Sequence, residues 1–282
     1  MYRFVLLMRP QQWVKNLFVF LPLFFDRKLL DTACLVPTVI VFAAFCLLSS
    51  AVYCFNDIRD VEADRLHPHK CKRPVASGDV SIAQAYVVMA VCLVGGGILL
   101  AMLNHTVCCL GAVYVVLNWL YCIRLKQIAL IDTFIVAVGF VIRIFAGGGA
   151  SGSYISHWIV MMTFLLALFL ALAKRRDDVV IYDETGVLTR KHIVSYNIAF
   201  LDTALAIIST VIVICYIMYT VSAEVVERIG SRYLYTTSAI VLLGVLRYLQ
   251  LTVVDKCSGS PTRIFYRDRF IQICVALWVI WY

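Results

Sequence analysis

The chain is 282 residues long, and 62% of its residues are hydrophobic while only 15% are charged. A soluble domain has no place to bury so much apolar surface, because it must also cover itself with polar groups. The composition therefore predicts a polytopic membrane protein and argues against a disordered chain, a secreted disulfide scaffold and a soluble nucleic-acid binder. In a membrane protein, we expect the basic residues behind the net charge of +8 to set the orientation of the loops and to bind anionic phosphates.

Apolar runs that can cross a bilayer follow one another along the chain, and we count about nine of them. They begin near Leu17, Ala33, Ile82, Thr106, Leu130, Ile155, Asn197, Tyr233 and Phe270. The first run is short and contains Pro22. We therefore predict an all-α fold, a polytopic membrane helical bundle that forms a single domain over residues 1–282. The 11 cysteines show no CxxC pair and no zinc spacing, so we expect most of them to be small buried hydrophobes.

Basic residues are distributed unevenly between the two sets of loops that this count predicts. Nearly all Lys and Arg outside the apolar runs fall in segments 1–16, 57–80, 124–129, 174–196 and 254–269. The connections on the opposite side contain only Arg27, Lys28, Arg228 and Arg232. By the positive-inside rule, the N-terminus and the long loops lie in the cytoplasm and the C-terminus lies outside.

The first cytoplasmic loop carries closely spaced carboxylates. If the second apolar helix continues into it, Asp57, Asp60 and Asp64 fall at positions i, i+3 and i+7 and share one face. Asn56 is then stacked over Asp60. Like charges so close repel one another, and Mg²⁺ prefers hard oxygen ligands and leaves room for substrate phosphates, so the pattern predicts a magnesium site. The alternative is a solvated acidic loop.

A basic run, His67-Pro68-His69-Lys70-Cys71-Lys72-Arg73-Pro74, follows the carboxylates. Pro68 ends the helix, and the run returns cations toward the acidic face, as expected of a site for Mg²⁺ bound to a polyphosphate. The positive-inside rule alone is the competing explanation for these Lys and Arg residues. Loop histidines are more often exposed or hydrogen-bonded than bound to metal, so we do not assign His67 or His69 to the site.

These elements resemble motifs of the UbiA superfamily of intramembrane prenyltransferases. The matching motifs are Asn56-Asp57-x-x-Asp60-x-x-x-Asp64, then Arg65-x-His67-Pro68-x-Lys70-x-x-Arg73-Pro74, and Tyr121-x-x-x-Leu125-Lys126. The resemblance implies nine helices around a lipid-accessible cavity, with Mg²⁺ and a diphosphate at its cytoplasmic mouth. Asn56, Asp57, Asp60 and Asp64 would bind the metal, and the three aspartates would be catalytic.

The third cytoplasmic loop departs from the members of the superfamily that use prenyl diphosphates. Those members carry a second acidic motif there, whereas this chain reads Leu172-Ala173-Lys174-Arg175-Arg176-Asp177-Asp178. Asp183 and Glu184 follow at the wrong spacing. Three segments resemble the branch formed by the decaprenyl-phosphate phosphoribosyltransferases: Arg9-Pro10-x-Gln12-Trp13-Val14-Lys15-Asn16, Lys174-Arg175-Arg176, and Ser258-Gly259-Ser260-Pro261-Thr262 with Asp268-Arg269-Phe270.

That branch implies transfer of 5-phosphoribose from 5-phosphoribosyl 1-diphosphate to a polyprenyl (decaprenyl) phosphate, with release of diphosphate. Because the donor carries a diphosphate and a separate 5-phosphate, and the acceptor is another phosphate, the site needs more cations than a prenyltransferase site. The residues expected to bind substrate are Lys15, Lys70, Arg73, Tyr121, Lys126, Lys174, Arg175 and Asp178. The competing explanation for Lys174-Arg175-Arg176 is a stop-transfer cap on the sixth helix.

Two other functions stay open from the sequence. A UbiA-type prenyltransferase would move an isoprenoid from a prenyl diphosphate to an aromatic acceptor, and the missing second acidic motif speaks against it. A transporter of a phosphorylated lipid or anion would need charged or broken helices through the midplane, whereas the charges here concentrate at one face. We expect an integral protein of a bacterial plasma membrane that is active at the cytoplasmic face, and we leave open whether it forms homo-oligomers.

Four ionisable residues and one glycine run lie within the apolar segments. Asp132 and Asp202 lie near cytoplasmic helix ends, where they could orient Lys126 or Lys174 or cap a helix, and capping is favoured for Asp202. Arg143 and Arg247 lie deeper and should face a cavity or a partner, or snorkel to an interface. For the run Gly147-Gly148-Gly149 we expect loosening or close helix packing rather than phosphate binding.

Overall fold

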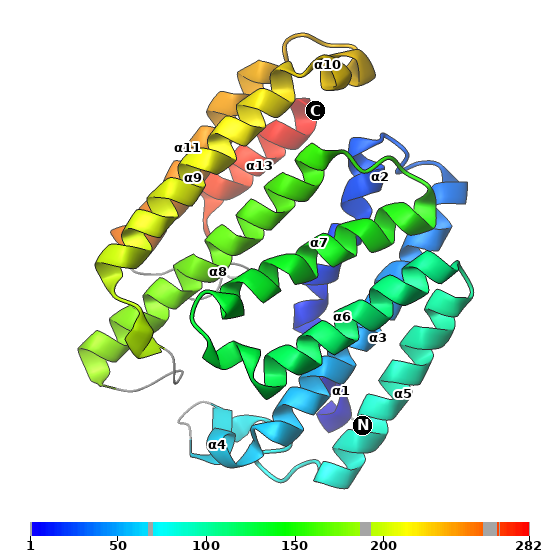
Figure 1. Ribbon diagram of the computed structural model, residues 1–282, viewed down its shortest axis with the longest axis vertical. Helices are drawn as coiled ribbons and strands as arrows, with labels where there is room; N and C mark the ends of the chain where they lie inside the picture. The colour runs from blue at the N-terminus through cyan, green and yellow to red at the C-terminus, as the bar shows by residue number, and fades with distance from the viewer. Residues whose placement is uncertain (1, 67–69, 187–192, 256–263, 265, 282) are drawn as a thin grey trace. The chain divides into compact units, whose positions relative to one another are not determined.

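The computed structural model describes residues 2–66, 70–186, 193–255, 264 and 266–281 (Figure 1). Within these ranges every regular element is an α-helix or a 3₁₀-helix, which confirms the predicted all-α class. The predicted motif residues His67, Pro68 and His69 and the segment 258–262 lie outside the described residues.

Seven of the described helices are long and apolar enough to cross a membrane. They are α3 (Thr32–Arg59), α5 (Ile82–Ala101), α6 (His105–Ile123), α7 (Ile131–Ser151), α8 (His157–Thr185), α9 (Ile198–Val221) and the stretch formed by η5 (Leu234–Thr237) and α11 (Ser238–Val253). The apolar helix α13 (Arg269–Trp281) is shorter. These elements follow the order of the predicted runs, and the protein is an integral membrane protein. The count of nine spans stays a prediction.

The first predicted run is not one continuous helix. It is divided into α1 (Tyr2–Met8), the 3₁₀-helix η1 (Pro10–Phe20) and α2 (Leu21–Phe25). Arg9, between α1 and η1, has a φ of 52°, and a 3₁₀-helix of 11 residues is unusually long. Side chains of η1 bond to α3: Trp13 Nε1 donates to Ser50 Oγ at 3.1 Å, and Asn16 Nδ2 donates to Ser49 Oγ at 3.3 Å. These bonds favour the tighter helix beside α3.

Polar side chains cap the starts of several helices. Ser81 and Gln84 form a capping box at the start of α5. Asn104 and Asn197 accept hydrogen bonds from backbone N–H groups in the first turns of α6 and α9. Asn197 therefore caps α9, and the predicted capping role of Asp202 is wrong. The remaining short elements are α4 (Val61–Arg65), η2 (Lys70–Lys72), η3 (Leu125–Gln127), η4 (Ile193–Ser195) and α10 (Ala223–Ile229).

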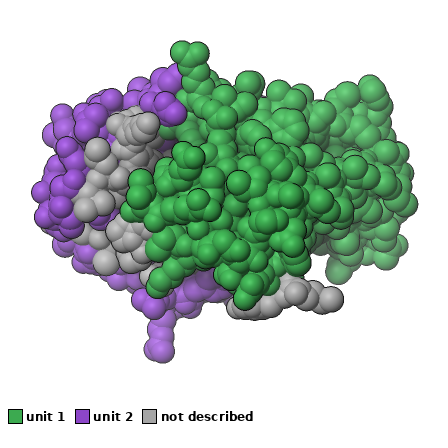
Figure 2. All heavy atoms as spheres, turned by 90° about the horizontal axis from the view of Figure 1, so that it is seen from below, with its two compact units in different colours: residues 1–126, 138–156 green, residues 127–137, 157–282 purple. Residues whose placement is uncertain are grey.

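The chain forms two compact units, coloured separately in Figure 2. Unit 1 comprises residues 1–126 and 138–156, and unit 2 comprises residues 127–137 and 157–282. The core of unit 1 includes Phe45 and Tyr114, whereas the core of unit 2 includes Phe169. Each unit buries its own apolar core, and the single domain expected from the sequence stays a prediction.

One glycine permits a close backbone approach inside unit 1. A Cβ atom on Gly147 would lie 1.9 Å from the carbonyl oxygen of Val19, so no larger residue fits here without movement of η1 or α7. Close packing, one of the two roles expected for this glycine run, is confirmed at Gly147.

Candidate functional site

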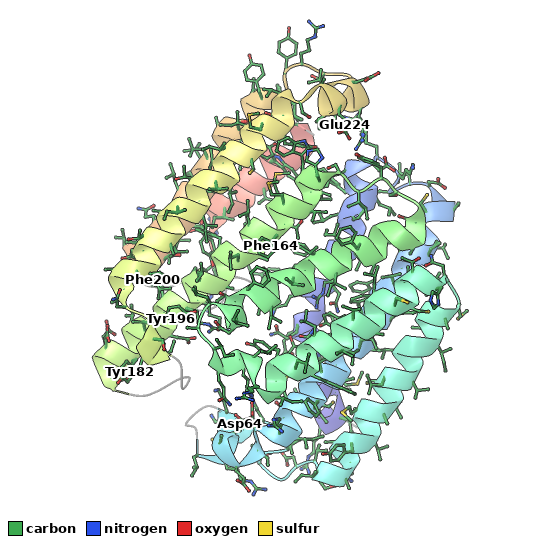
Figure 3. The ribbon with its side chains drawn as sticks, in the orientation of Figure 1. Asp64, Phe164, Tyr182, Tyr196, Phe200 and Glu224 are labelled. Atoms are coloured by element: carbon green, nitrogen blue, oxygen red, sulfur yellow. The ribbon has the colours of Figure 1, made fainter. Side chains whose placement is uncertain are left out.

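The three aspartates of the acidic motif lie where α3 ends and α4 begins, all within unit 1 (Figure 3, which labels Asp64). Asp57 and Asp64 are buried, and Asp60 separates the two helices. The N–H of Asp60 donates to the carbonyl of Asn56 at 2.9 Å, and the N–H of Asp64 donates to that of Asp60 at 2.8 Å. The helical path therefore continues through Asp60 and keeps the three carboxylates at helical spacing.

Each of these carboxylates is paired with a cation from another part of unit 1. Arg9 Nη2 donates to Asp57 Oδ1 at 2.5 Å. Arg73 Nη1 donates to Asp64 Oδ2 at 2.5 Å and to Asp57 Oδ1 at 3.3 Å. Lys126 Nζ lies 2.7 Å from both oxygens of Asp60 and 3.5 Å from Asn56 Oδ1. Three positive charges thus balance three negative charges. Arg73 and Lys126 come from the two motifs that the sequence singled out.

Local structure fixes the segments that carry these cations. Arg73 and Pro74 begin a turn in which the N–H of Ser77 donates to the carbonyl of Arg73 at 2.8 Å. Arg65 Nε donates to the carbonyl of Ala76 at 3.3 Å and ties this turn to α4. Lys126 lies in η3, directly after α6. Arg59 Nη2 reaches the carbonyl of Ile123, at the end of α6, at 3.5 Å.

The chemistry of these side chains fits a divalent cation that prefers oxygen. Asp57, Asp60, Asp64 and Asn56 all present hard oxygen atoms, the donor type that Mg²⁺ prefers. Asp57 is only 1% exposed, and among the described residues its buried Oδ2 atom has no hydrogen-bond partner. In the described part of the chain, no three His, Cys, Asp or Glu side chains converge as a ready-made metal group. The cations, rather than one another, are the nearest partners of these carboxylates.

Three further residues predicted to bind substrate lie on the segments of unit 1 that carry these cations. Lys15 lies in η1, downstream of Arg9, and is half-buried. Lys70 begins η2, shortly before Arg73. Tyr121 lies in the last turn of α6, shortly before Lys126. Their roles toward a substrate stay predictions.

The predicted residues of the third cytoplasmic loop lie on α8, in unit 2. Arg175 is buried, and its Nε donates to Asp132 Oδ2 and its Nη1 to Asp178 Oδ2, both at 2.6 Å. The hydroxyl of Tyr196 donates to Asp132 Oδ1 at 3.3 Å and accepts the backbone N–H of Leu130 at 2.6 Å. Lys174 is exposed. Asp178 therefore contacts Arg175 itself.

Two further charged pairs lie in the same unit, Arg176 with Asp202 and Arg247 with Asp268. Arg176 Nε donates to Asp202 Oδ1 at 2.5 Å, and its Nη1 donates to the carbonyl of Thr252 at 2.8 Å. Asp132 and Asp202 thus orient Arg175 and Arg176, whereas the sequence suggested Lys126 or Lys174. Arg247 Nη2 donates to Asp268 Oδ2 at 2.8 Å, so its partner is found near the start of α13.

Arg143 is a buried cation of unit 1, and its hydrogen-bond partners in the described ranges are neutral groups. Its Nε donates to Asn16 Oδ1 at 2.8 Å, its Nη1 to the carbonyl of Gly139 at 2.7 Å and its Nη2 to the Tyr114 hydroxyl at 2.9 Å. The guanidinium carbon also lies 4.7 Å from the centre of the Tyr114 ring. Arg143 therefore connects η1, α6 and α7 deep in the unit.

Comparison with known proteins decides the family. The model of the UbiA prenyltransferase family matches residues 28–273. The chain belongs to the UbiA prenyltransferase family. That range includes both the carboxylates of unit 1 and the buried ion pairs of unit 2, but it begins after Arg9.

Curated relatives within this family are similar along almost the whole chain. The decaprenyl-phosphate phosphoribosyltransferase of Mycolicibacterium smegmatis is 32% identical, over 96% of this chain and 88% of the relative. The protein of the same name from Mycobacterium tuberculosis H37Rv is 33% identical, over 96% of this chain and 90% of the relative. In both alignments the shared length exceeds the family range, so the similarity is not confined to the common motifs.

Solved structures of UbiA homologues share the fold. A homologue from Archaeoglobus fulgidus, described as bound to GPP and Mg²⁺, has a TM-score of 0.76 and 19% identity, over 99% of this chain and 97% of its own. The apo structure of a homologue from Aeropyrum pernix K1 has a TM-score of 0.70 and 18% identity, over 96% of this chain and 98% of its own. At such identities the likeness establishes the UbiA fold alone.

Arg9 belongs to one of the matching sequence segments, but its pattern did not identify it as a site residue of this UbiA protein. Arg9 is far from Asp57 in sequence, and its contact depends on the backbone turn before Pro10. The available signal was a basic residue followed by proline at the head of a Trp, Lys and Asn segment. That pattern marks a break in an apolar run but does not reveal what the arginine contacts.

Proposed function

We propose that this protein transfers 5-phosphoribose from 5-phosphoribosyl 1-diphosphate to a polyprenyl phosphate and releases diphosphate. The observation that carries the proposal is the similarity, over 96% of the chain, to relatives named decaprenyl-phosphate phosphoribosyltransferases. The run of Lys174, Arg175 and Arg176 supports it, because it replaces the second acidic motif expected of members that use prenyl diphosphates. The lipid tail would remain among the apolar helices.

Asp57, Asp60 and Asp64, with Asn56, would hold a divalent cation, Mg²⁺ in our proposal. Their hard oxygen atoms and the unpartnered Oδ2 of Asp57 support this assignment. When bound, the cation supplies positive charge that stabilises the leaving diphosphate. The catalytic contribution of the three aspartates is therefore electrostatic, and no Ser, Cys or His nucleophile is assigned.

The basic residues of unit 1 would bind the phosphate oxygens. Arg73 offers a planar fork that can grip phosphate through two parallel hydrogen bonds, whereas Lys15, Lys70 and Lys126 offer point charges. Tyr121 adds a hydroxyl donor from the end of α6. These residues would position the donor so that its reacting carbon is accessible to the acceptor.

In unit 2, Lys174 is the residue we assign to a phosphate. Its exposed side chain supports this role, as does its place beside a buried arginine pair on the same helix. Arg175, paired with Asp132 and Asp178, would orient this end of α8 and so position Lys174. Asp178 would then serve the site by holding Arg175.

The reaction follows from the charges of the two substrates. The bond between C1 of the ribose and the diphosphate oxygen breaks with oxocarbenium character, and the diphosphate leaves with the electron pair. An oxygen of the lipid phosphate attacks C1 from the opposite face, so we expect inversion at C1. Since the acceptor is already anionic, no general base is needed. Catalysis then depends on positioning and charge stabilisation.

The competing reaction within the family moves an isoprenoid from a prenyl diphosphate to an aromatic acceptor. Purified protein should be incubated with radiolabelled phosphoribosyl diphosphate and several polyprenyl phosphates. We expect a labelled lipid, and release of diphosphate only when both substrates are present. Release from a prenyl diphosphate plus an aromatic acid, with none from the phosphoribosyl donor, would overturn the proposal in favour of the competing reaction.

We also infer that the site faces the cytoplasm of a bacterium, with the N-terminus inside and the C-terminus outside the plasma membrane. The uneven distribution of basic loop residues supports this orientation. Fusions at Lys70 should be active with a cytoplasmic reporter, and fusions at Ser153 with an external reporter. Activity of an external reporter at Lys70 would contradict the orientation.

A further inference from the structure

Basic side chains of unit 1 neutralise the negative charges of its acidic cluster. Asp57, Asp60 and Asp64 carry three negative charges, and Arg9, Arg73 and Lys126 carry three positive charges within hydrogen-bond distance of them. A divalent cation that binds these carboxylates would add two positive charges to a cluster that is already neutral. Because two of the carboxylates are buried, that excess is poorly screened by water.

Arg9 is held at Asp57 by a specific backbone arrangement. Its φ of 52° lies in the left-handed region, which residues other than glycine rarely adopt. Ser50 Oγ fixes both flanks, since it donates to the carbonyl of Met8 at 2.9 Å and accepts Trp13 Nε1 at 3.1 Å. The guanidinium also lies 5.0 Å from the centre of the Tyr53 ring. Several contacts therefore stabilise an unfavourable conformation that points Arg9 at the buried carboxylate.

The charges of the cluster sum to zero, but its hydrogen bonding is incomplete at one carboxylate oxygen. Asp57 accepts Arg9 and Arg73 through Oδ1, but its buried Oδ2 has no partner in the part of the chain that the structure describes. A buried carboxylate oxygen without a partner has unused capacity to bind a ligand. The same arginines have further N–H groups, because a guanidinium carries five donors. The cluster can therefore accept a cation at its carboxylates and an anion at its cations together.

We propose that Arg9, Arg73 and Lys126 act as exchangeable counter-ions that couple binding of a divalent metal to binding of diphosphate. When the carboxylates bind the metal, the three cations bind the oxygens of the diphosphate, so neither set of charges is left unpaired. Metal alone binds weakly because it must displace the cations without giving them a new partner. Metal and diphosphate together bind tightly. The inference rests on the proposed function in one respect, that the leaving group is diphosphate. Both candidate donors release this group.

Calorimetry on the purified full-length protein tests this coupling with inorganic probes. Magnesium chloride alone and the preformed complex of Mg²⁺ with inorganic diphosphate are titrated separately. For the wild type we expect the complex to bind at least about tenfold more tightly than Mg²⁺ alone. In Arg9→Gln, Mg²⁺ alone should bind several-fold more tightly, because one counter-ion of Asp57 is gone. The complex should bind about tenfold more weakly, because one charge-assisted donor to diphosphate is lost.

Effects of opposite sign distinguish exchange from a structural role. A purely structural Arg9 would weaken both titrations in Arg9→Gln, and this outcome, or no change in either, overturns the proposal. Lys126→Gln provides the same test at Asp60, should Arg9→Gln fail to fold. Arg3→Gln is the matched control, since exposed Arg3 pairs with Asp79 on the surface of the same unit, and both affinities should match the wild type. Inorganic diphosphate carries neither a phosphoribosyl nor a prenyl group, so the binding test does not depend on which donor the enzyme uses. A failed transfer assay and a failed coupling test can therefore be told apart.

Discussion

Carboxylates meet cations in both units, but they share hydrogen bonds in different ways. In unit 2, Arg175 and Asp132 are 3% and 0% exposed, and Arg175 donates to two carboxylates while Asp132 also accepts Tyr196. In unit 1, Asp60 and Lys126 remain 27% and 20% exposed, and Asp57 Oδ2 has no partner among the described residues. The network of Arg175 and Asp132 in unit 2 is thus internally satisfied, whereas Asp57 in unit 1 keeps capacity for a ligand.

We propose that this difference separates charges that maintain the fold from charges that bind metal and substrate. A buried pair that is completely hydrogen-bonded fixes the helices that carry it, and removing one member leaves an uncompensated charge. The unit 1 cluster, in which Asp60 and Lys126 are partly exposed and Asp57 has a spare acceptor atom, can exchange partners instead. We therefore expect mutations in unit 2 to affect stability most, and mutations in unit 1 to affect activity most.

The largest effect on stability should come from Arg175→Met, which leaves Asp132 buried without its main cation. Breaking such a pair costs about 3–5 kcal/mol, so the melting temperature in detergent should fall sharply. Its neighbour gives the matched comparison, because exposed Lys174→Met should lower melting far less than Arg175→Met while reducing kcat/KM for the phosphoribosyl donor about tenfold. Equal melting temperatures for the two variants would contradict a structural role for the pair.

The next effect concerns activity, in unit 1. Asp57→Asn, Asp60→Asn and Asp64→Asn each remove an anionic metal ligand while nearly keeping side-chain size. Each should lower kcat/KM at least ~100-fold, with unchanged size-exclusion behaviour. Asp79→Asn is the control, because Asp79 is an exposed carboxylate of the same unit. Near-normal turnover in all three variants would show that this cluster does not bind the metal.

A smaller loss of stability should follow from Gly147→Ala, which tests the close packing of η1 against α7 in unit 1. The new methyl group would meet the Val19 carbonyl, and overpacking of this kind costs about 1–3 kcal/mol. Gly97→Ala is the control, because its Cβ would have no neighbour within 4 Å. If both variants have the same melting temperature, the close approach of η1 and α7 does not contribute to stability.

The smallest effect tests the satisfied network of unit 2. Tyr196→Phe removes the hydroxyl that accepts Leu130 N–H and donates to Asp132, at a cost of about 1–2 kcal/mol. Burial raises the pKa of Tyr196 to about 12, above the value near 10 of an unfolded tyrosine. Its contribution is therefore complete below about pH 10 and is lost as the pH rises through 12. Melting curves of wild type and variant should converge over that interval, and a constant difference would contradict this.

The sequence predicted the elements that depend on local pattern. Hydropathy located α3 and α5 to α9, and the expected helical path through Asp57, Asp60 and Asp64 is present. The division of the first run was not predicted, because it depends on bonds from Trp13 and Asn16 to α3 rather than on hydropathy. The contact of Arg9 with Asp57 and the pairing of Arg175 with Asp132 were missed for the same reason. Such pairs join residues distant in sequence, and one sequence contains no signal for them.

The measurement that tests the contrast between the two units most directly is anomalous diffraction from crystals grown with Mn²⁺ and diphosphate. The central claim is that the carboxylates of unit 1 bind the metal, while those of unit 2 maintain the fold. We predict an anomalous peak beside Asp57, Asp60 and Asp64 with diphosphate density next to it, and no peak at Asp132, Asp178 or Asp202. A metal bound at the unit 2 carboxylates, or diphosphate bound with no metal at the unit 1 cluster, would contradict the claim.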